Sequence, residues 1–176
     1  FDIKGGGPVI DMGPYYFTTL VNLLGPAKNV QGRSLKMFEE REIGIGPKKG
    51  KKFKVNCPTS YLATIEFENN SIIQLTLSFD VAAHQRNHIE VYGTKGSAIV
   101  PDPNMFGGSC HIFTSSSGKW NEYKTDEMHL GKINITSQSS RANESASNAN
   151  YRGVGLSEMA YSIEQNEAHR CSGELS

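Results

Sequence analysis

SYLATIEFENNSIIQLTLSF, residues 60–79, carries the strongest structural signal in this sequence. Apolar residues occupy every second position from Tyr61 to Phe67, and again from Ile73 to Phe79. Alternation of this kind is typical of a β-strand that buries one face. The short segment Asn69-Asn70-Ser71 between the two runs predicts a tight turn. The stretch as a whole therefore predicts an antiparallel hairpin.

The apolar positions of this hairpin share one face: Ile65, Phe67, Ile73, Leu75, Leu77 and Phe79. An antiparallel sheet commonly buries one face and exposes the other to solvent, so helix or another subunit must cover this apolar row. Large apolar faces are seldom left exposed. We expect the chain to self-associate through this row, as a homodimer or a higher homo-oligomer.

The segment that precedes the hairpin is predicted to begin with a helix at residues 11–24. Its apolar residues recur at helical spacing: Tyr16, Phe17, Leu20, Val21 and Leu24. Gly25-Pro26 is a strong stop signal, and Pro14 falls in the first turn, where proline is tolerated. Residues 30–39 then predict a strand. Residues 44–54 predict a loop of Gly, Pro and Lys without fixed geometry, whose lysines are solvated rather than an anion site.

Two more hairpins are predicted after residue 80, one from 89–92 with 97–100 and one from 111–113 with 120–123. The polar residues 132–150 predict a loop, and residues 156–167 a second helix. A helix, a run of hairpins and a late helix describe an α+β fold. We expect a large, mostly antiparallel open sheet with helices packed on one face, in a single domain of residues 1–176.

Composition excludes several classes of protein. Basic and acidic residues balance at 18 each, and zero net charge argues against a nucleic-acid or anionic-membrane partner. No apolar stretch approaches the ~20 residues that span a bilayer, and the N-terminus carries no signal peptide. The three cysteines, which have no metal-ligand spacing, predict a reduced, cytoplasmic setting. Both ends of the chain look cut.

Asp11 and Tyr15 are the first candidate site residues. They are separated by four positions, so both project from one side of the helix start. A carboxylate and a phenol placed there could converge on a substrate hydroxyl. Alternatively, Asp11 caps the helix and Tyr15 packs its ring. The neighbouring glycine run 5–7 lacks the G-x-G-x-x-G spacing and the preceding strand of a nucleotide-binding turn, so the chain predicts no nucleotide site of its own.

His84 and Gln85 form a second candidate segment. His84 and His88 have the spacing of a zinc-binding helix, but no Glu follows His84 and the context is a turn that leads into a strand. The sequence therefore predicts hydrogen bonding to a substrate, or plain surface exposure, rather than a metal site.

Seven blocks resemble, in the same order, the Gfo/Idh/MocA oxidoreductases, the glucose-fructose oxidoreductase and inositol dehydrogenase family. They are residues 5–16, 23–26, 78–80, 89–96, 102–104 with 106–108, 150–153 and 169–175. The resemblance implies an N-terminal Rossmann domain that is absent from this chain and that holds NAD or NADP. This chain would then be the C-terminal substrate-binding and oligomerisation domain, with its last helix truncated, and would be inactive in isolation. The implied substrate is a sugar, a cyclitol or a related polyol.

The resemblance also implies roles for the candidate residues. In the family an Asp and a His on the helix after the Gly-rich loop act with a lysine of the missing domain. Asp11 occupies the Asp position, and Tyr15 stands where many members have His. Because tyrosine ordinarily titrates near ~10 and histidine near ~6.5, the lysine is the better proton acceptor. Tyr15 would then hydrogen-bond the substrate hydroxyl, and Asp11 would orient the reacting groups.

By position in the family, His84 and Gln85 would approach the substrate from the sheet side. Tyr15 also keeps open an alternative from a different class. In that alternative the protein is a non-catalytic, regulatory member of the family that binds a sugar or a protein partner.

Overall fold

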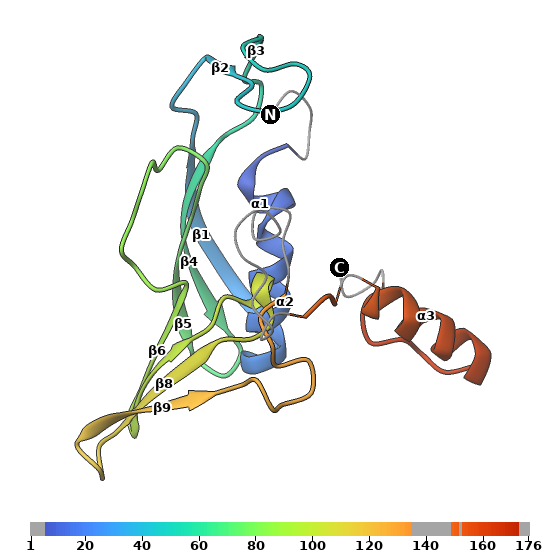
Figure 1. The fold of residues 1–176 in the computed structure, drawn as a ribbon. Coiled ribbons are helices and arrows are strands. Elements are labelled where there is room, and N and C mark those ends of the chain that lie inside the picture. Colours follow the sequence, from blue (N-terminus) through green and yellow to red (C-terminus); the bar gives the residue numbers. More distant parts are fainter. Residues whose placement is uncertain (1–5, 135–148, 152, 173–176) are drawn as a thin grey trace. The chain divides into compact units, whose positions relative to one another are not determined.

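The computed structural model describes residues 6–134, 149–151 and 153–172 (Figure 1). Its contacts divide the chain into two compact units, Phe1–His84 and Gln85–Ser176. The expectation of a single domain stays a prediction. None of the helices in the described part of the chain is both long and apolar enough to cross a bilayer.

The first unit begins with two helices, α1 (Pro8–Asp11) and α2 (Gly13–Leu24). Met12 lies between them with helical backbone angles, φ −106° and ψ −29°, so the two helices run on almost as one. Gly25 ends α2 with φ +84°, a conformation that glycine adopts without the steric cost of a Cβ atom. The predicted helix over 11–24 is confirmed, and a short turn of helix precedes it.

The hairpin of residues 60–79 is confirmed as β4 (Ser60–Phe67) and β5 (Ile72–Ser78). Tyr61 lies opposite Leu77, and Ile65 lies opposite Ile73. β1 (Ala27–Leu35) pairs with the other edge of β4, which gives the antiparallel order β1-β4-β5. At the turn, Asn70 has φ +66°, and the Ser71 amide donates to Asn69 Oδ1 over 2.9 Å.

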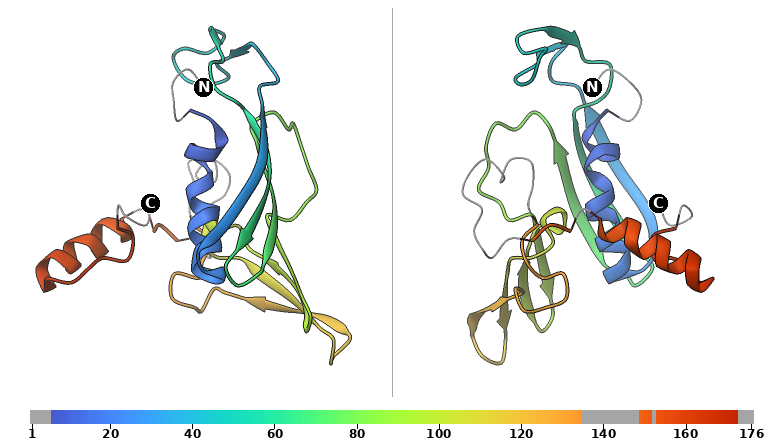
Figure 2. Two further views of the ribbon diagram at one scale, coloured as in Figure 1. Left: turned by 180° about the vertical axis from the view of Figure 1, so that it is seen from behind. Right: turned by 45° about the vertical axis from the view of Figure 1, so that its right-hand side comes forward.

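One face of this sheet is covered by α1 and α2 (Figures 1 and 2). Ile65, Phe67 and Leu77 are buried on that face. The opposite face carries exposed side chains, including Leu62 at 51% and Ile72 at 67%. The expectation that the apolar row meets another subunit is therefore wrong, because the helices of the same chain cover it. The face left open for a partner is the other one.

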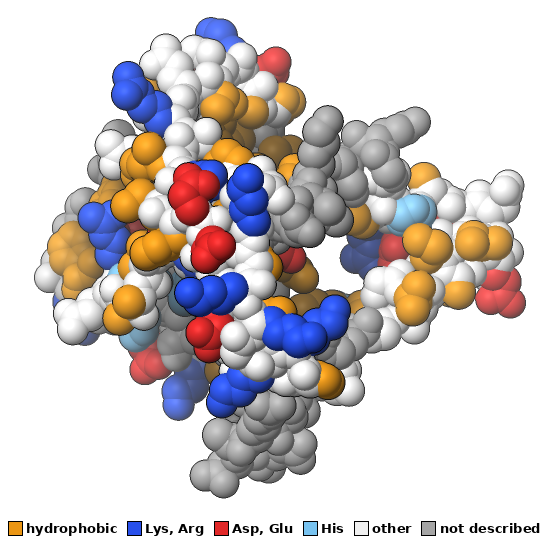
Figure 3. Space-filling view, turned by 90° about the horizontal axis from the view of Figure 1, so that it is seen from above, with side chains coloured by type: hydrophobic (Ala, Val, Ile, Leu, Met, Phe, Trp, Pro, Cys, Tyr) orange, Lys and Arg blue, Asp and Glu red, His pale blue; other side chains and the backbone are white. Residues whose placement is uncertain are grey.

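The lysine-rich segment is also more ordered than expected. β2 (Glu40–Glu42) and β3 (Lys52–Lys54) pair, so Glu40 lies opposite Lys54 and Glu42 opposite Lys52. Backbone hydrogen bonds close the turn, among them the one from the Gly50 amide to the Ile43 carbonyl at 2.8 Å. The prediction of a loop without fixed geometry is wrong here. Figure 3, which views this end, shows acidic side chains among the basic ones rather than a continuous basic patch.

The second unit has a four-stranded antiparallel sheet in the order β6-β7-β8-β9. Its strands are β6 (Ile89–Gly93), β7 (Gly96–Val100), β8 (Ser109–Thr114) and β9 (Lys119–Lys124), with a 3₁₀ turn η1 (Pro103–Met105) between β7 and β8. Both predicted hairpins are confirmed.

The late helix is α3 (Val154–Gln165), which ends at Asn166 with φ +56°. Of the predicted loop 132–150, residues 135–148 lie outside the described residues. All pairings between the labelled strands are antiparallel, so the α+β class is confirmed, although the described strands form three sheets rather than a single large one.

Gly131, in the second unit, lies so close to neighbouring backbone atoms that we expect a side chain there to destabilise the fold. An added Cβ there would lie 1.8 Å from the Thr125 carbonyl oxygen, a backbone atom that cannot rotate away. We expect Gly131→Ala to lower the free energy of unfolding by about 2 kcal/mol through overpacking. Gly155→Ala is the control, because an added Cβ in α3 meets nothing within 4 Å and alanine favours helix. Urea titrations followed by circular dichroism check both; an equal stability of the two variants would contradict the prediction.

Candidate functional site

The start of α1 is fixed by tight packing at the glycine turn. Gly7 and Pro8 are buried, and a Cβ on Gly7 would lie 2.7 Å from the Pro58 carbonyl oxygen and 3.6 Å from the Tyr61 hydroxyl. A side chain at position 7 would push the helix away from the sheet. Glycine here therefore lets α1 sit directly on the segment that leads into β4.

Asp11 is the last residue of α1, and its side chain is exposed. Its amide donates to the Gly7 carbonyl over 3.1 Å, which closes the single turn of α1. Met12 occupies the N-cap position of α2, and no side chain caps that helix. The alternative in which Asp11 serves as a helix cap is therefore wrong, and its carboxylate stays accessible.

Tyr15 lies in the first turn of α2 with 48% of its surface exposed, so its ring is not packed away in the core. Its carbonyl accepts a hydrogen bond from Thr19 Oγ1 over 2.9 Å. Because Met12 keeps the helical backbone, the four-residue spacing still places Asp11 and Tyr15 on neighbouring turns. A carboxylate and a phenol are thus presented to solvent by one rigid segment.

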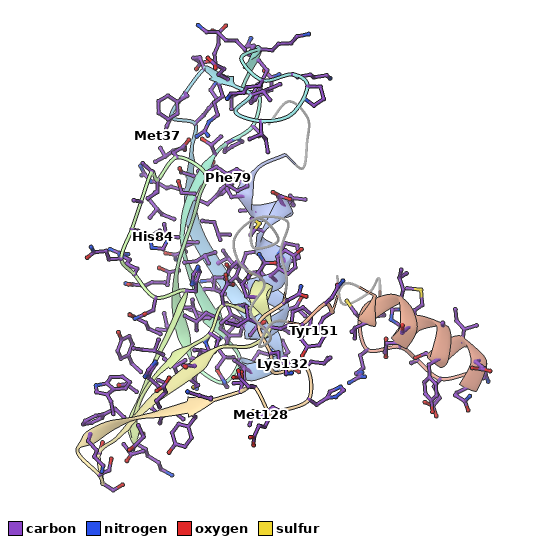
Figure 4. The ribbon with its side chains drawn as sticks, in the orientation of Figure 1. Met37, Phe79, His84, Met128, Lys132 and Tyr151 are labelled. Atoms are coloured by element: carbon purple, nitrogen blue, oxygen red, sulfur yellow. The ribbon has the colours of Figure 1, made fainter. Side chains whose placement is uncertain are left out.

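His84 and Gln85 are exposed and lie on either side of the boundary between the two units. His84, which belongs to the first unit, follows β5 on the side of the sheet away from α1 and α2 (Figure 4). The structure therefore does not bring His84 beside Asp11 and Tyr15. Its predicted contact with a substrate stays a prediction, as does that of Gln85.

The start of α1 does not fit the pyrophosphate of a dinucleotide. A pyrophosphate site needs free amides at the start of a helix, with glycines that let the phosphate approach. At α1 that space is filled, since Gly7 already rests on the Pro58 carbonyl. The described residues also contain no group of three or more His, Cys, Asp or Glu side chains that could hold a metal ion.

A partly buried polar cluster around Asp80 is a feature that the sequence did not predict. We define the Asp80 cluster as Arg41, Thr59, Ser60, Ser78 and Asp80. The Thr59 and Ser60 hydroxyls each donate to Asp80 Oδ2 over 2.6 Å, and Arg41 forms a short ion pair with Asp80 Oδ1. The Asp80 side chain is only 7% exposed. In the sequence, Ser78-Phe79-Asp80 stands out only as part of the family resemblance.

The Asp80 cluster joins three segments of the first unit. Arg41 comes from β2, Ser60 opens β4, and Ser78 closes β5 directly across from Ser60. Arg41 also donates to the Phe79 carbonyl over 2.8 Å. Burial raises the pKa of Asp80, but hydrogen bonds from Ser60, Thr59 and Arg41 and the charge of Arg41 more than offset it, so this pKa lies below its ordinary value. The carboxylate is thus held ionised at neutral pH.

Two of the sequence blocks that resemble the family meet in the second unit. The rings of Phe106 and Tyr151 are 5.0 Å apart, and the Tyr151 amide donates to Asn134 Oδ1 over 2.9 Å. Asn134 is itself buried and donates its amide to the Met105 carbonyl. Arg152, which belongs to one of these two blocks, lies outside the described residues. Gly5, Gly173, Glu174 and Leu175, which belong to other blocks, also lie outside them.

Solved structures with the same fold include oxidoreductases and a transcriptional regulator. One is levoglucosan dehydrogenase in complex with NADH and L-sorbose. The alignment covers 97% of this chain and 45% of the dehydrogenase chain, with a TM-score of 0.67 and 17% sequence identity. Another is an oxidoreductase from Agrobacterium radiobacter in complex with NAD⁺, L-tartaric acid and magnesium. The alignment covers 94% of this chain and 42% of the oxidoreductase chain, with a TM-score of 0.57 and 10% sequence identity. The alignment with the transcriptional regulator Gal80p from Kluyveromyces lactis covers 70% of this chain and 32% of the regulator chain, with a TM-score of 0.54 and 10% sequence identity.

This chain spans less than half the length of each of these proteins. No curated protein sequence matches it. The family model for the GFO/IDH/MocA C-terminal domain matches residues 2–99, more than half of the chain. The ordered blocks, the α+β fold and this match agree, and the chain belongs to the GFO/IDH/MocA family as a C-terminal domain.

Proposed function

We propose that this chain is the substrate-side domain of an NAD(P)-dependent dehydrogenase that oxidises a hydroxyl group of a sugar, a cyclitol or a related polyol. The observation that carries the proposal is the exposed pair Asp11 and Tyr15, presented by a helix start whose backbone is locked against the sheet. Substrate-contacting groups need such rigid placement. The likeness to an oxidoreductase solved with NAD⁺ and L-tartaric acid, and to a dehydrogenase solved with NADH and L-sorbose, supports the same class of reaction.

In this proposal the nicotinamide cofactor is held by a separate nucleotide-binding domain, since the start of α1 leaves no room for its pyrophosphate. Tyr15 hydrogen-bonds the substrate hydroxyl, because a phenol both donates and accepts. Asp11 orients the reacting groups through its charge. A lysine of the other domain, with a pKa lowered by burial, takes the proton.

The test of the proposal is turnover by the full-length protein that contains this domain. Reduction of NAD⁺ and NADP⁺ is followed at 340 nm, as nicotinamide absorbance, against a panel of sugars, cyclitols and linear polyols. Saturable turnover with at least one member of the panel is the expected result. Absence of turnover with every member, from a protein that melts cooperatively and binds NAD(H), would reject the proposed activity.

A second candidate function is a non-catalytic regulator that binds a sugar or a protein partner. Tyr15 favours it, because many family members have a histidine at this position. The fold likeness to the regulator Gal80p also supports it. Calorimetric binding of a sugar by a protein that shows no turnover would favour this candidate over the dehydrogenase.

We also propose that the protein is a homodimer or a higher homo-oligomer through the open face of the β1-β4-β5 sheet. Leu62 is near the middle of that face, between Arg33 and Thr76 in the register, and is 51% exposed. Leu62→Asp is expected to shift the full-length protein toward monomer, because it replaces an exposed apolar side chain in the middle of the proposed interface with a charge. Asn22→Asp adds the same charge to the exposed surface of α2 and is the control. Light scattering at micromolar concentration checks both; an unchanged mass for Leu62→Asp would contradict this interface.

A further inference from the structure

The segment Cys57–Thr59 connects the Asp80 cluster to the start of α1. At one end, the Pro58 carbonyl oxygen touches Gly7 so closely that a Cβ on Gly7 would lie 2.7 Å from it. Cys57 Sγ would lie 3.8 Å from the same Cβ. The backbone at Gly7 therefore rests on this segment without intervening space, and a shift of Pro58 moves the first turn of α1.

At the other end, Thr59 is held from three directions. Its amide donates to the Leu35 carbonyl over 2.8 Å, and its carbonyl accepts from the Phe79 amide over 2.8 Å. Its hydroxyl donates to Asp80 Oδ2 over 2.6 Å. Thr59 is completely buried, so solvent cannot replace the hydroxyl contact with the carboxylate. Phe79, labelled in Figure 4, lies at the end of the sheet next to α1.

α1 depends on this support because it is a single turn at the N-terminal end of the helical segment formed by α1 and α2. It has four residues, and its closing hydrogen bonds run from Asp11 to Gly7 and from Met12 to Pro8. The end turn of a helix opens more easily than the interior of the helix. The burial of Gly7 and Pro8 against the segment before β4 therefore sets the direction of α1.

We infer that Thr59 and Asp80 are positioning residues for Asp11 and Tyr15. They hold Pro58 in place, Pro58 supports Gly7, and Gly7 sets the direction in which α1 presents the two candidate groups. The inference rests on the proposed function for its catalytic consequence, although the structural link is independent of it.

The test compares two substitutions at Thr59 in the full-length protein. Thr59→Val keeps the side-chain shape and removes the hydroxyl donor to Asp80. Thr59→Ser keeps the donor and removes one methyl group. We expect kcat to fall about tenfold in Thr59→Val, since small displacements of catalytic groups cost up to about 10²-fold. Thr59→Ser is expected to stay within about twofold of wild type, because the hydroxyl is restored.

Hydrogen exchange of the amides of Asp11 and Met12 gives a readout that does not depend on turnover. It is expected to accelerate about tenfold in Thr59→Val and to stay unchanged in Thr59→Ser, because local opening of α1 becomes easier only when its support is lost. Phe67→Leu is the control for general destabilisation. Phe67 is buried at the other end of β4, and its replacement is expected to lower the melting temperature without changing exchange in α1.

The outcomes separate the two hypotheses. Unchanged exchange of Asp11 and Met12 in Thr59→Val overturns the positioning inference, whatever the activity. Equal acceleration in Phe67→Leu or in Thr59→Ser also overturns it, because the hydroxyl would then have no specific effect. A wild-type protein without turnover rejects the proposed dehydrogenase function, while the exchange comparison still decides whether Thr59 fixes α1.

Discussion

Replacement of Asp80 by alanine is expected to lower the free energy of unfolding of the first unit by about 3–5 kcal/mol, the usual cost of breaking a buried ion pair from one side. The Asp80 side chain is 7% exposed and that of Arg41 24%, so the guanidinium would lose its partner where water reaches it poorly. The Thr59 and Ser60 hydroxyls would lose their acceptor as well. Urea unfolding followed by circular dichroism measures the loss.

Asp126→Ala is the matched control for this prediction. It makes the same chemical change at an exposed position in the second unit, where we expect a change within about 0.5 kcal/mol. If Asp80→Ala were as stable as Asp126→Ala, the Asp80 cluster would contribute little to the fold. The positioning role inferred for Thr59 would then lose its physical basis.

The same cluster predicts the direction of a pH effect. The folded pKa of Asp80 lies below the ordinary aspartate value of 3.8, so the unfolded chain binds the proton more readily. The contribution of Asp80 to stability is therefore complete above the unfolded pKa and is lost as the pH falls through the folded pKa. We expect the acid-induced fall in stability to be less steep in Asp80→Asn, which has no proton to bind at this position. Denaturation series between neutral and acidic pH check this difference in slope.

The parts of the fold that follow from local pattern could be predicted from the sequence. Alternation from Tyr61 to Phe67 defined β4, and Gly25-Pro26 located the end of α2, because each signal lies within one element. The hairpin of β2 and β3 could not be predicted in this way. Its short strands carry mainly charged residues without an apolar face, and the pairing becomes visible only through the opposition of Glu40 and Lys54.

The sequence also could not show which surface each group would face. The apolar row of β5 alternates correctly, but only the three-dimensional position of α1 and α2 decides that the row is covered within the chain. The Asp80 cluster also depends on the three-dimensional arrangement. Its members come from segments that are far apart in the sequence, and Ser60 meets Ser78 only because the register of β4 and β5 places them opposite each other. Asp11 and Tyr15, by contrast, could be paired from the sequence, because their four-residue spacing lies within a single helical segment.

Tyr15→Phe in the full-length protein is expected to lower kcat and kcat/KM together by about 10²–10³-fold, the usual effect of deleting a hydrogen-bond donor that acts in the transition state. The fold should change little, because only one oxygen atom is removed from a side chain that is 48% exposed. Asp11→Asn should also impair turnover, since an amide keeps the shape of the side chain but loses the charge that orients the reacting groups. Its melting temperature should equal that of wild type, because the Asp11 side chain caps no helix.

Steady-state kinetics with the true substrate, together with thermal melts, check both variants. Asn22→Ala is the matched control, because Asn22 is an exposed polar residue further along α2 and should keep wild-type rates. A Tyr15 that only positions the substrate would raise KM and leave kcat unchanged, which distinguishes binding from participation in the chemical step. Wild-type rates in both Tyr15→Phe and Asp11→Asn would mean that this helix end has no part in the reaction. The substrate contacts would then have to come from other residues, with His84 and Gln85 the next to be tested.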